Sequence, residues 1–124
     1  MTEDILHGNV FVNQEGDIID ELAELTKACF SLARNGLISQ EKREEFSKKA
    51  ETLAIITQVL ARKKFGDMSA NIDNDVKNLK QQTTDVKKKI ARLDQLVDNL
   101  ETVNDILRLV DQGLAIAAGL AKTF

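Results

Sequence analysis

A regular spacing of apolar residues in the second half of the chain restricts the fold more than any other feature of the sequence. From Ile72 onward, these residues recur at alternating steps of four and three, which is the heptad pattern of helices that pack side by side. The run consists of Ile72, Val76, Leu79, Thr83, Val86, Ile90, Leu93, Val97 and Leu100. Thr83 is its single polar member. The chain contains no proline, and we expect an all-α fold.

The apolar spacing continues beyond Leu100 in a different register. It resumes three residues later, at Val103, and no glycine or proline occurs between residues 67 and 112. These features predict one long, coiled-coil-like C-terminal helix over about residues 69–122. The alternative is a break near residues 101–104, where Thr102 or Asn104 would cap a new helix and produce a four-helix bundle.

The first half of the chain predicts an arm followed by two shorter helices. Residues 1–16 lack helical periodicity, and we expect them to form an extended N-terminal arm. Apolar residues at helical spacing then indicate helices over about 17–35 and 39–65, the second capped by Ser39. Because the linker is short, the two should form an antiparallel helical hairpin. Residues 17–124 would make up a single helical domain.

Residues that commonly carry chemistry are scarce in this sequence. One histidine and one cysteine are too few for the usual zinc or di-iron sites, and the known phosphate-loop and nucleophile motifs do not occur. Cys29 falls on the apolar face of the helix predicted over 17–35, where a cysteine is usually a small buried apolar residue. The sequence therefore predicts no enzymatic activity, no metal and no cofactor.

The charge distribution is uneven but does not favour nucleic acid as the partner. Residues 1–24 hold seven acids and no base, whereas residues 25–93 hold 15 bases and eight acids. The clusters 62–64 and 87–89 are basic, yet acids lie nearby, and tryptophan and tyrosine are absent. Polyanion binding is therefore a second alternative. A single cysteine and an acidic N-terminus are typical of a cytoplasmic protein.

Helix length suggests how the protein acts. If the long helix pairs with the helix over 39–65, Lys87, Lys88 and Lys89 lie beside Glu44 and Glu45. The two shorter helices then shield the long helix from solvent only to about Leu93. The apolar positions beyond it would need a second chain. We therefore predict a non-enzymatic protein–protein interaction or oligomerisation module. Its partner would be a second copy, a dimer being favoured, or another helical protein. The predicted interaction seam consists of Leu96, Leu100, Val103, Leu107, Val110, Leu114, Ala117 and Ala121.

The apolar stretch over residues 113–121 leaves a further alternative, a membrane-active helical protein that inserts this segment. Nine residues of helix span only about 14 Å, much less than a bilayer. A tightly packed helix crossing explains the small residues in this stretch more simply, and a membrane is the less favoured partner.

Overall fold

The computed structural model describes the backbone of residues 2–62 and 70–123, and the surroundings of the side chains of residues 18–62 and 74–122. Within these ranges the protein is all-α, as expected, and has no strand. The helices are α1 (Thr2–Ala33), α2 (Gln40–Ala61), α3 (Ala70–Arg92) and α4 (Leu100–Thr123), with a 3₁₀ turn, η1 (Leu93–Gln95), between α3 and α4.

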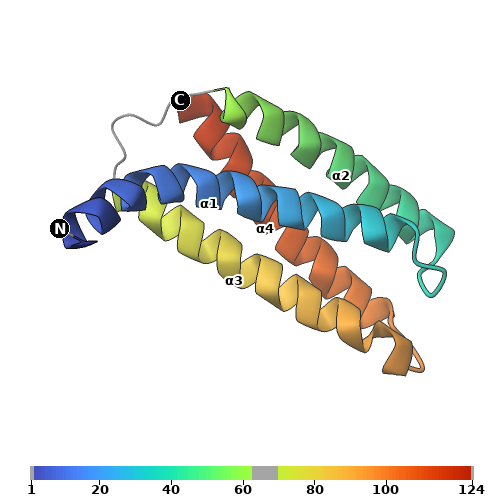
Figure 1. The fold of residues 1–124 in the computed structure, drawn as a ribbon. Coiled ribbons are helices and arrows are strands. Elements are labelled where there is room, and N and C mark those ends of the chain that lie inside the picture. The colour runs from blue at the N-terminus through green and yellow to red at the C-terminus, as the bar shows by residue number, and fades with distance from the viewer. Residues whose placement is uncertain (1, 63–69, 124) are drawn as a thin grey trace.

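The four helices form a bundle of two antiparallel pairs (Figure 1). The helices α1 and α2 make one pair, α3 and α4 make the other, and α1 and α3 run in the same direction. Helix α1 packs along α2 and α3, and α4 packs along the same two helices, so α2 and α3 occupy opposite corners of the bundle. The connections α1–α2 and α3–α4 consequently lie at the same end.

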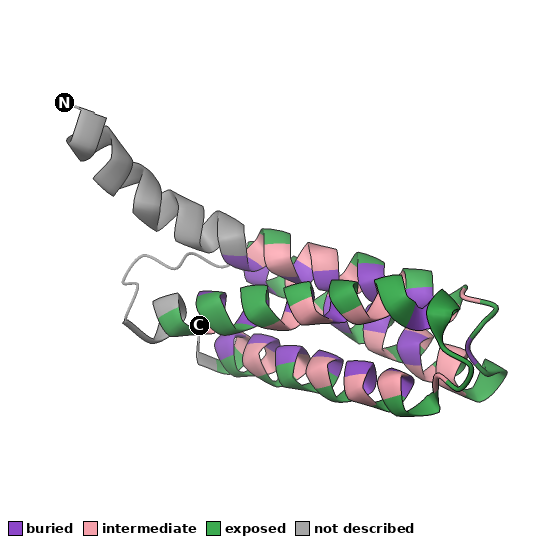
Figure 2. Ribbon diagram, turned by 90° about the horizontal axis from the view of Figure 1, so that it is seen from below, coloured by how far each residue is buried: buried purple, intermediate pink, exposed green. Residues whose placement is uncertain are grey.

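The core is built from the helix faces that the apolar spacing indicated. Along α3, Val76, Leu79, Thr83 and Val86 are buried, and Leu93 continues this face into η1. Figure 2 shows how the buried residues turn toward the centre of the bundle, while exposed residues cover its outside. The largest fully buried side chains are Phe46, Ile18, Leu22, Leu25, Leu32, Leu53, Leu60, Leu79, Leu93 and Ile106.

Helix α1 begins at Thr2, so the prediction of an extended arm over residues 1–16 is wrong. The two glycines in this segment, Gly8 and Gly16, each disfavour a helix interior by only about 1 kcal/mol. Without a proline, nothing in the segment blocks the continuation of α1 toward the N-terminus. The expected cap of the second helix is confirmed, because the Ser39 side chain accepts a hydrogen bond from the backbone N–H of Lys42 at 3.4 Å.

The single long helix predicted over 69–122 is also wrong, since the chain leaves the helix at η1 and α4 begins at Leu100. The four-helix alternative describes the fold, with a break slightly before residues 101–104. Leu96 has extended backbone angles, and the Asp98 carboxylate accepts a hydrogen bond from the N–H of Leu100 at 3.1 Å. Asp98 therefore supports the start of α4 without any glycine or proline.

Burial explains why the chain turns back on itself. The residues Val103, Ile106, Leu107 and Val110 on α4 are buried inside the bundle, whereas a straight helix would leave them in water. Burying one such side chain is worth about 1.5–3 kcal/mol, and one backbone hydrogen bond lost at the turn costs about 1 kcal/mol net. The gain from several buried side chains exceeds the cost of the break.

The lysine cluster 87–89 does not lie beside Glu44 and Glu45, because α2 and α3 are not neighbours. Lys87 instead forms an ion pair with Glu24 of α1 at 2.9 Å, and Lys89 approaches Asp105 of α4 at 4.0 Å. The ion pair with Lys87 lowers the pKa of the Glu24 carboxyl below its usual value, chiefly through the hydrogen bond that Lys87 donates.

The two helix pairs approach closely at Gly113 of α4. A Cβ atom built there would lie 2.6 Å from Leu25 Cδ2 on α1 and 3.7 Å from Leu79 Cδ2 on α3. Ala117, one turn later on the same face, is fully buried. The small residues of this stretch thus permit a tight helix crossing within one chain.

Candidate functional site

The candidate site lies at the end of the bundle that holds the α1–α2 and α3–α4 connections. The segment 34–39 connects α1 to α2, and residues 93–99 connect α3 to α4. A hydrogen bond joins the two segments, since the Asn99 side-chain amide donates to the backbone carbonyl of Leu37 at 2.6 Å. This bond links positions 62 residues apart in the sequence and fixes the two turns side by side.

Four large apolar side chains are exposed at this end. They are Leu37 from the first turn, with 53% of its surface exposed, and Leu96, Val97 and Leu100 from the second, with 39%, 108% and 53%. We call these four residues the apolar end. Only two other large apolar residues of the described chain are comparably exposed, Ile55 and Val59 on α2. Most of the exposed apolar surface from large residues is therefore gathered at one end.

The eight residues of the predicted interaction seam separate into two groups. Leu96 and Leu100 belong to the apolar end. The remaining six face the other helices of the same chain: Val103, Leu107, Val110 and Ala117 are buried, and Leu114 and Ala121 are partly buried. The other helices of the same chain shield these six residues from solvent, so no second chain is needed to bury them. The stretch after Val103 therefore gives no argument for an oligomer.

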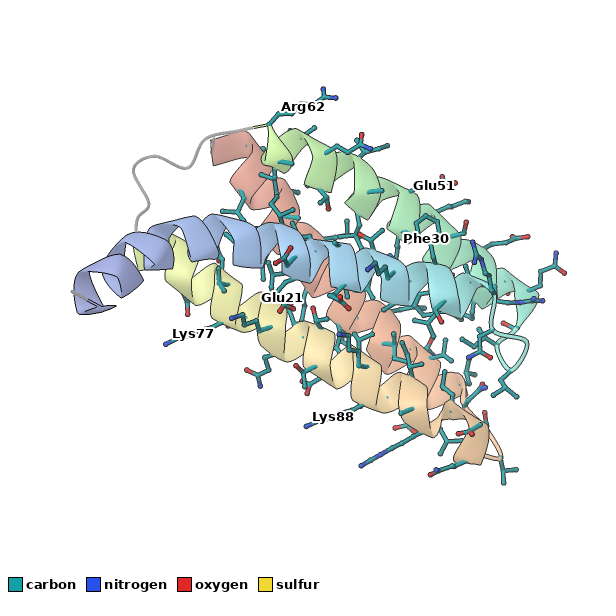
Figure 3. The ribbon with its side chains drawn as sticks, viewed as in Figure 1. Glu21, Phe30, Glu51, Arg62, Lys77 and Lys88 are labelled. Atoms are coloured by element: carbon teal, nitrogen blue, oxygen red, sulfur yellow. The ribbon has the colours of Figure 1, made fainter. Side chains whose placement is uncertain are left out.

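Two arginines on the α1–α2 side of this end have no ion-pair partner within the described residues. Arg34 follows α1, Arg43 lies in the first turns of α2, and neither guanidinium contacts a carboxylate. The Arg43 Nε atom is shielded from solvent and lacks an acceptor. Both side chains border a shallow hollow that Phe30 also lines. Figure 3 labels Phe30 between α1 and α2.

The α3–α4 side of the same end carries unpaired carboxylates. Asp94 and Glu101 are exposed and have no partner among the described residues, while Asp98 accepts only the backbone hydrogen bond from Leu100. These three acids alternate with the apolar residues of the turn. The second turn therefore combines exposed apolar side chains with carboxylates, whereas residues 34–45, which include the first turn, contain three basic and three acidic residues.

Among the described residues, the other side chains that commonly carry chemistry are not gathered into a metal site. The described residues contain no group of three His, Cys, Asp or Glu side chains that could hold a metal ion. Cys29 is fully buried, and its burial raises the pKa of the thiol to about 12, so it is protonated at neutral pH. The side chain of His7 lies outside the described part of the chain.

No helix in the described residues has the length and apolar character that crossing a membrane requires. Comparisons with protein-family models, with curated proteins and with solved structures found no match.

Only part of this surface could be identified from the sequence. Leu96 and Leu100 were among the predicted seam residues, but Leu37, Arg34 and Arg43 were not singled out. A usable signal lies in residues 93–101, where Asp and Asn, both typical capping residues, interrupt an otherwise helical apolar spacing.

Proposed function

We propose that this protein is a non-enzymatic helical interaction module that binds another protein surface through the apolar end. The observation that supports this proposal is the gathering of Leu37, Leu96, Val97 and Leu100 on two joined turns. Single exposed apolar residues are common on soluble proteins, but contiguous ones usually mark a contact surface. This replaces the C-terminal seam as the proposed binding surface.

The position of these residues supports the same proposal. Binding residues often lie on short loops that a rigid scaffold holds in place. Here the scaffold is the four-helix bundle, and the bond between Asn99 and Leu37 fixes one loop relative to the other. Such a surface loses little conformational freedom when it binds, which favours affinity.

Site-specific photocrosslinking in the cells that make the protein tests this function. A photoreactive phenylalanine analogue at Val97 should give covalent protein adducts, whereas the same analogue at Gln81, an exposed residue in the middle of α3, should not. Adding Leu96→Asp to the Val97 probe should reduce the adducts, because a carboxylate disfavours an apolar contact. Equal adducts from positions 97 and 81 would refute a contact surface at this end.

The two alternatives from the sequence predict other signals. A membrane-active protein would release dye from liposomes, and a polyanion-binding protein would bind heparin with a strong dependence on salt. A protein–protein interaction module should neither release the dye nor bind heparin. Both assays use the purified full chain and are independent of the crosslinking result.

A further inference from the structure

We infer that the apolar end binds a cationic amphipathic segment of another protein, an inference that rests on the proposed function and specifies the chemistry of the partner. Such a segment carries lysine or arginine side chains beside a short apolar face. Its apolar face covers Leu96, Val97 and Leu100, and its cations meet the carboxylates that alternate with these residues in the second turn.

The second turn carries an excess of negative charge. Residues 93–101 contain three acids and no base. Asp94, Asp98 and Glu101 are exposed, and none of them forms an ion pair within the described residues. Arg92 is the nearest base in the sequence and offsets one of the three charges. The exposed apolar residues of this turn therefore lie among a net excess of carboxylates.

The spacing of these groups couples the apolar contact to the charged one. Each of the three acids lies within two residues of an exposed apolar side chain in the sequence. A partner that covers the apolar side chains therefore also removes water from the carboxylates. A carboxylate that loses water without gaining a cation or a hydrogen-bond donor is costly. Lysine or arginine beside the apolar residues of the partner avoids this cost, whereas a purely apolar or an acidic partner does not.

The first turn adds apolar surface without a net charge. Residues 35–40, which include Leu37, contain no charged residue. Over residues 34–45, three basic and three acidic residues balance each other. The net charge of the end is therefore that of the second turn, which is negative. A second copy of this chain presents the same neutral and negative turns, so it gains no net attraction from charge.

The size of the end determines the length of the partner segment. With helices about 10 Å apart, the end of a four-helix bundle measures about 20 Å across and covers about 400 Å². A helix of about twelve residues is about 18 Å long, and an amphipathic one presents apolar side chains at positions i, i+3, i+4 and i+7. Because the area is about half of what each partner in a standard stable interface buries, we expect a dissociation constant of about 100 μM.

A synthetic peptide tests this inference with the purified full chain. The probe is the acetylated and amidated peptide LKKLWKKLLKKL, whose lysines flank an apolar helix face. Because the protein contains neither tryptophan nor tyrosine, the tryptophan of the peptide alone reports the contact by its fluorescence. Its emission should shift to shorter wavelengths and saturate with a dissociation constant of about 100 μM. The matched peptide LEELWEELLEEL, with glutamate in place of each lysine, should not bind.

Single substitutions locate the contact on the protein. Asp94→Lys and Glu101→Lys should each weaken binding of the lysine peptide about fivefold, because an attraction becomes a repulsion. Glu51→Lys is the matched control: it makes the same charge change at an exposed position midway along α2 (Figure 3) and should leave the dissociation constant unchanged. Val97→Ser removes an apolar contact from a fully exposed side chain and should also weaken binding about fivefold. Circular dichroism verifies that each variant is folded.

Reversing the charges on both sides of the contact provides the decisive measurement. The double variant Asp94→Lys, Glu101→Lys should lose the lysine peptide and bind the glutamate peptide instead. A double variant that still prefers the lysine peptide would overturn the role of the carboxylates. A wild type that binds both peptides equally, or neither of them, would overturn the cationic partner.

The outcomes also separate this inference from the proposed function. If the lysine peptide does not bind but the Val97 probe gives adducts in cells, the interaction function stands and only the chemistry of the partner is wrong. A wild type that sediments as a dimer without peptide, and as a monomer with Leu96→Asp, assigns the end to a second copy and overturns the inference. If neither adducts nor peptide binding is observed, both fail.

Discussion

The hydroxyl group of Thr83 allows a quantitative test of the core. Thr83 is 2% exposed, and its Oγ1 atom has no hydrogen-bond partner among the described residues. Leaving a buried polar group unsatisfied costs about 1–3 kcal/mol. Valine has nearly the same shape and replaces the hydroxyl with a methyl group. We therefore expect Thr83→Val to raise the free energy of unfolding by about 1–2 kcal/mol.

The size of the domain converts this energy into a melting temperature. For 124 residues, the entropy of unfolding is about 0.26 kcal/mol/K, so Tm should rise by about 4–8 °C in thermal melts followed by circular dichroism. Thr84→Val makes the same chemical change at an exposed neighbour and should alter stability by less than about 0.5 kcal/mol. Thr83→Ser keeps the hydroxyl, loses a methyl group and should destabilise by about 1 kcal/mol. A Thr83→Val protein less stable than wild type would refute the assignment of an unsatisfied hydroxyl.

Three further predictions follow from the described contacts. Leu107 is buried and Leu100 is exposed, so Leu107→Glu should abolish the helical circular dichroism signal at 25 °C, whereas Leu100→Glu should retain it. Because burial raises the pKa of Cys29 from 9.0 to about 12, the thiol should react with Ellman's reagent at pH 8 only in urea. The stability associated with this thiol should be complete below pH 9 and decline as the pH rises toward 12, which urea midpoints at several pH values would reveal. Lys87→Glu should lower Tm at low salt by placing a like charge beside Glu24, Glu24→Lys in the same chain should restore it, and both differences should shrink at high salt.

The local part of the fold could be predicted from the sequence. The heptad spacing identified the buried face of α3, including Leu79, and its continuation at Leu93 in η1, because side-chain periodicity directly reflects which side of a helix is apolar. Ser39 was recognisable as a cap because its hydroxyl satisfies a free N–H group of the first turn. These features depend on residues close together in the chain.

The order of the helices around the bundle could not be predicted in the same way. Whether the helix is interrupted near Leu93 depends on the burial of all the apolar residues on one face of α4, which is a property of the complete bundle. The pairing of Lys87 likewise depends on which helices are neighbours. The apolar end contains Leu37 and Val97, and their exposure follows only from the meeting of two turns that lie far apart in the sequence.

The hydrogen bond between Asn99 and Leu37 has a thermodynamic consequence for any molecule that recognises this end. Neither helix pair carries the complete surface, so the surface exists only while the two pairs are docked. Binding at the apolar end is therefore coupled to the equilibrium between docked and separated helix pairs. By mass action, a ligand specific for this surface stabilises the folded bundle in proportion to the logarithm of its concentration, so that recognition and folding are linked in this protein.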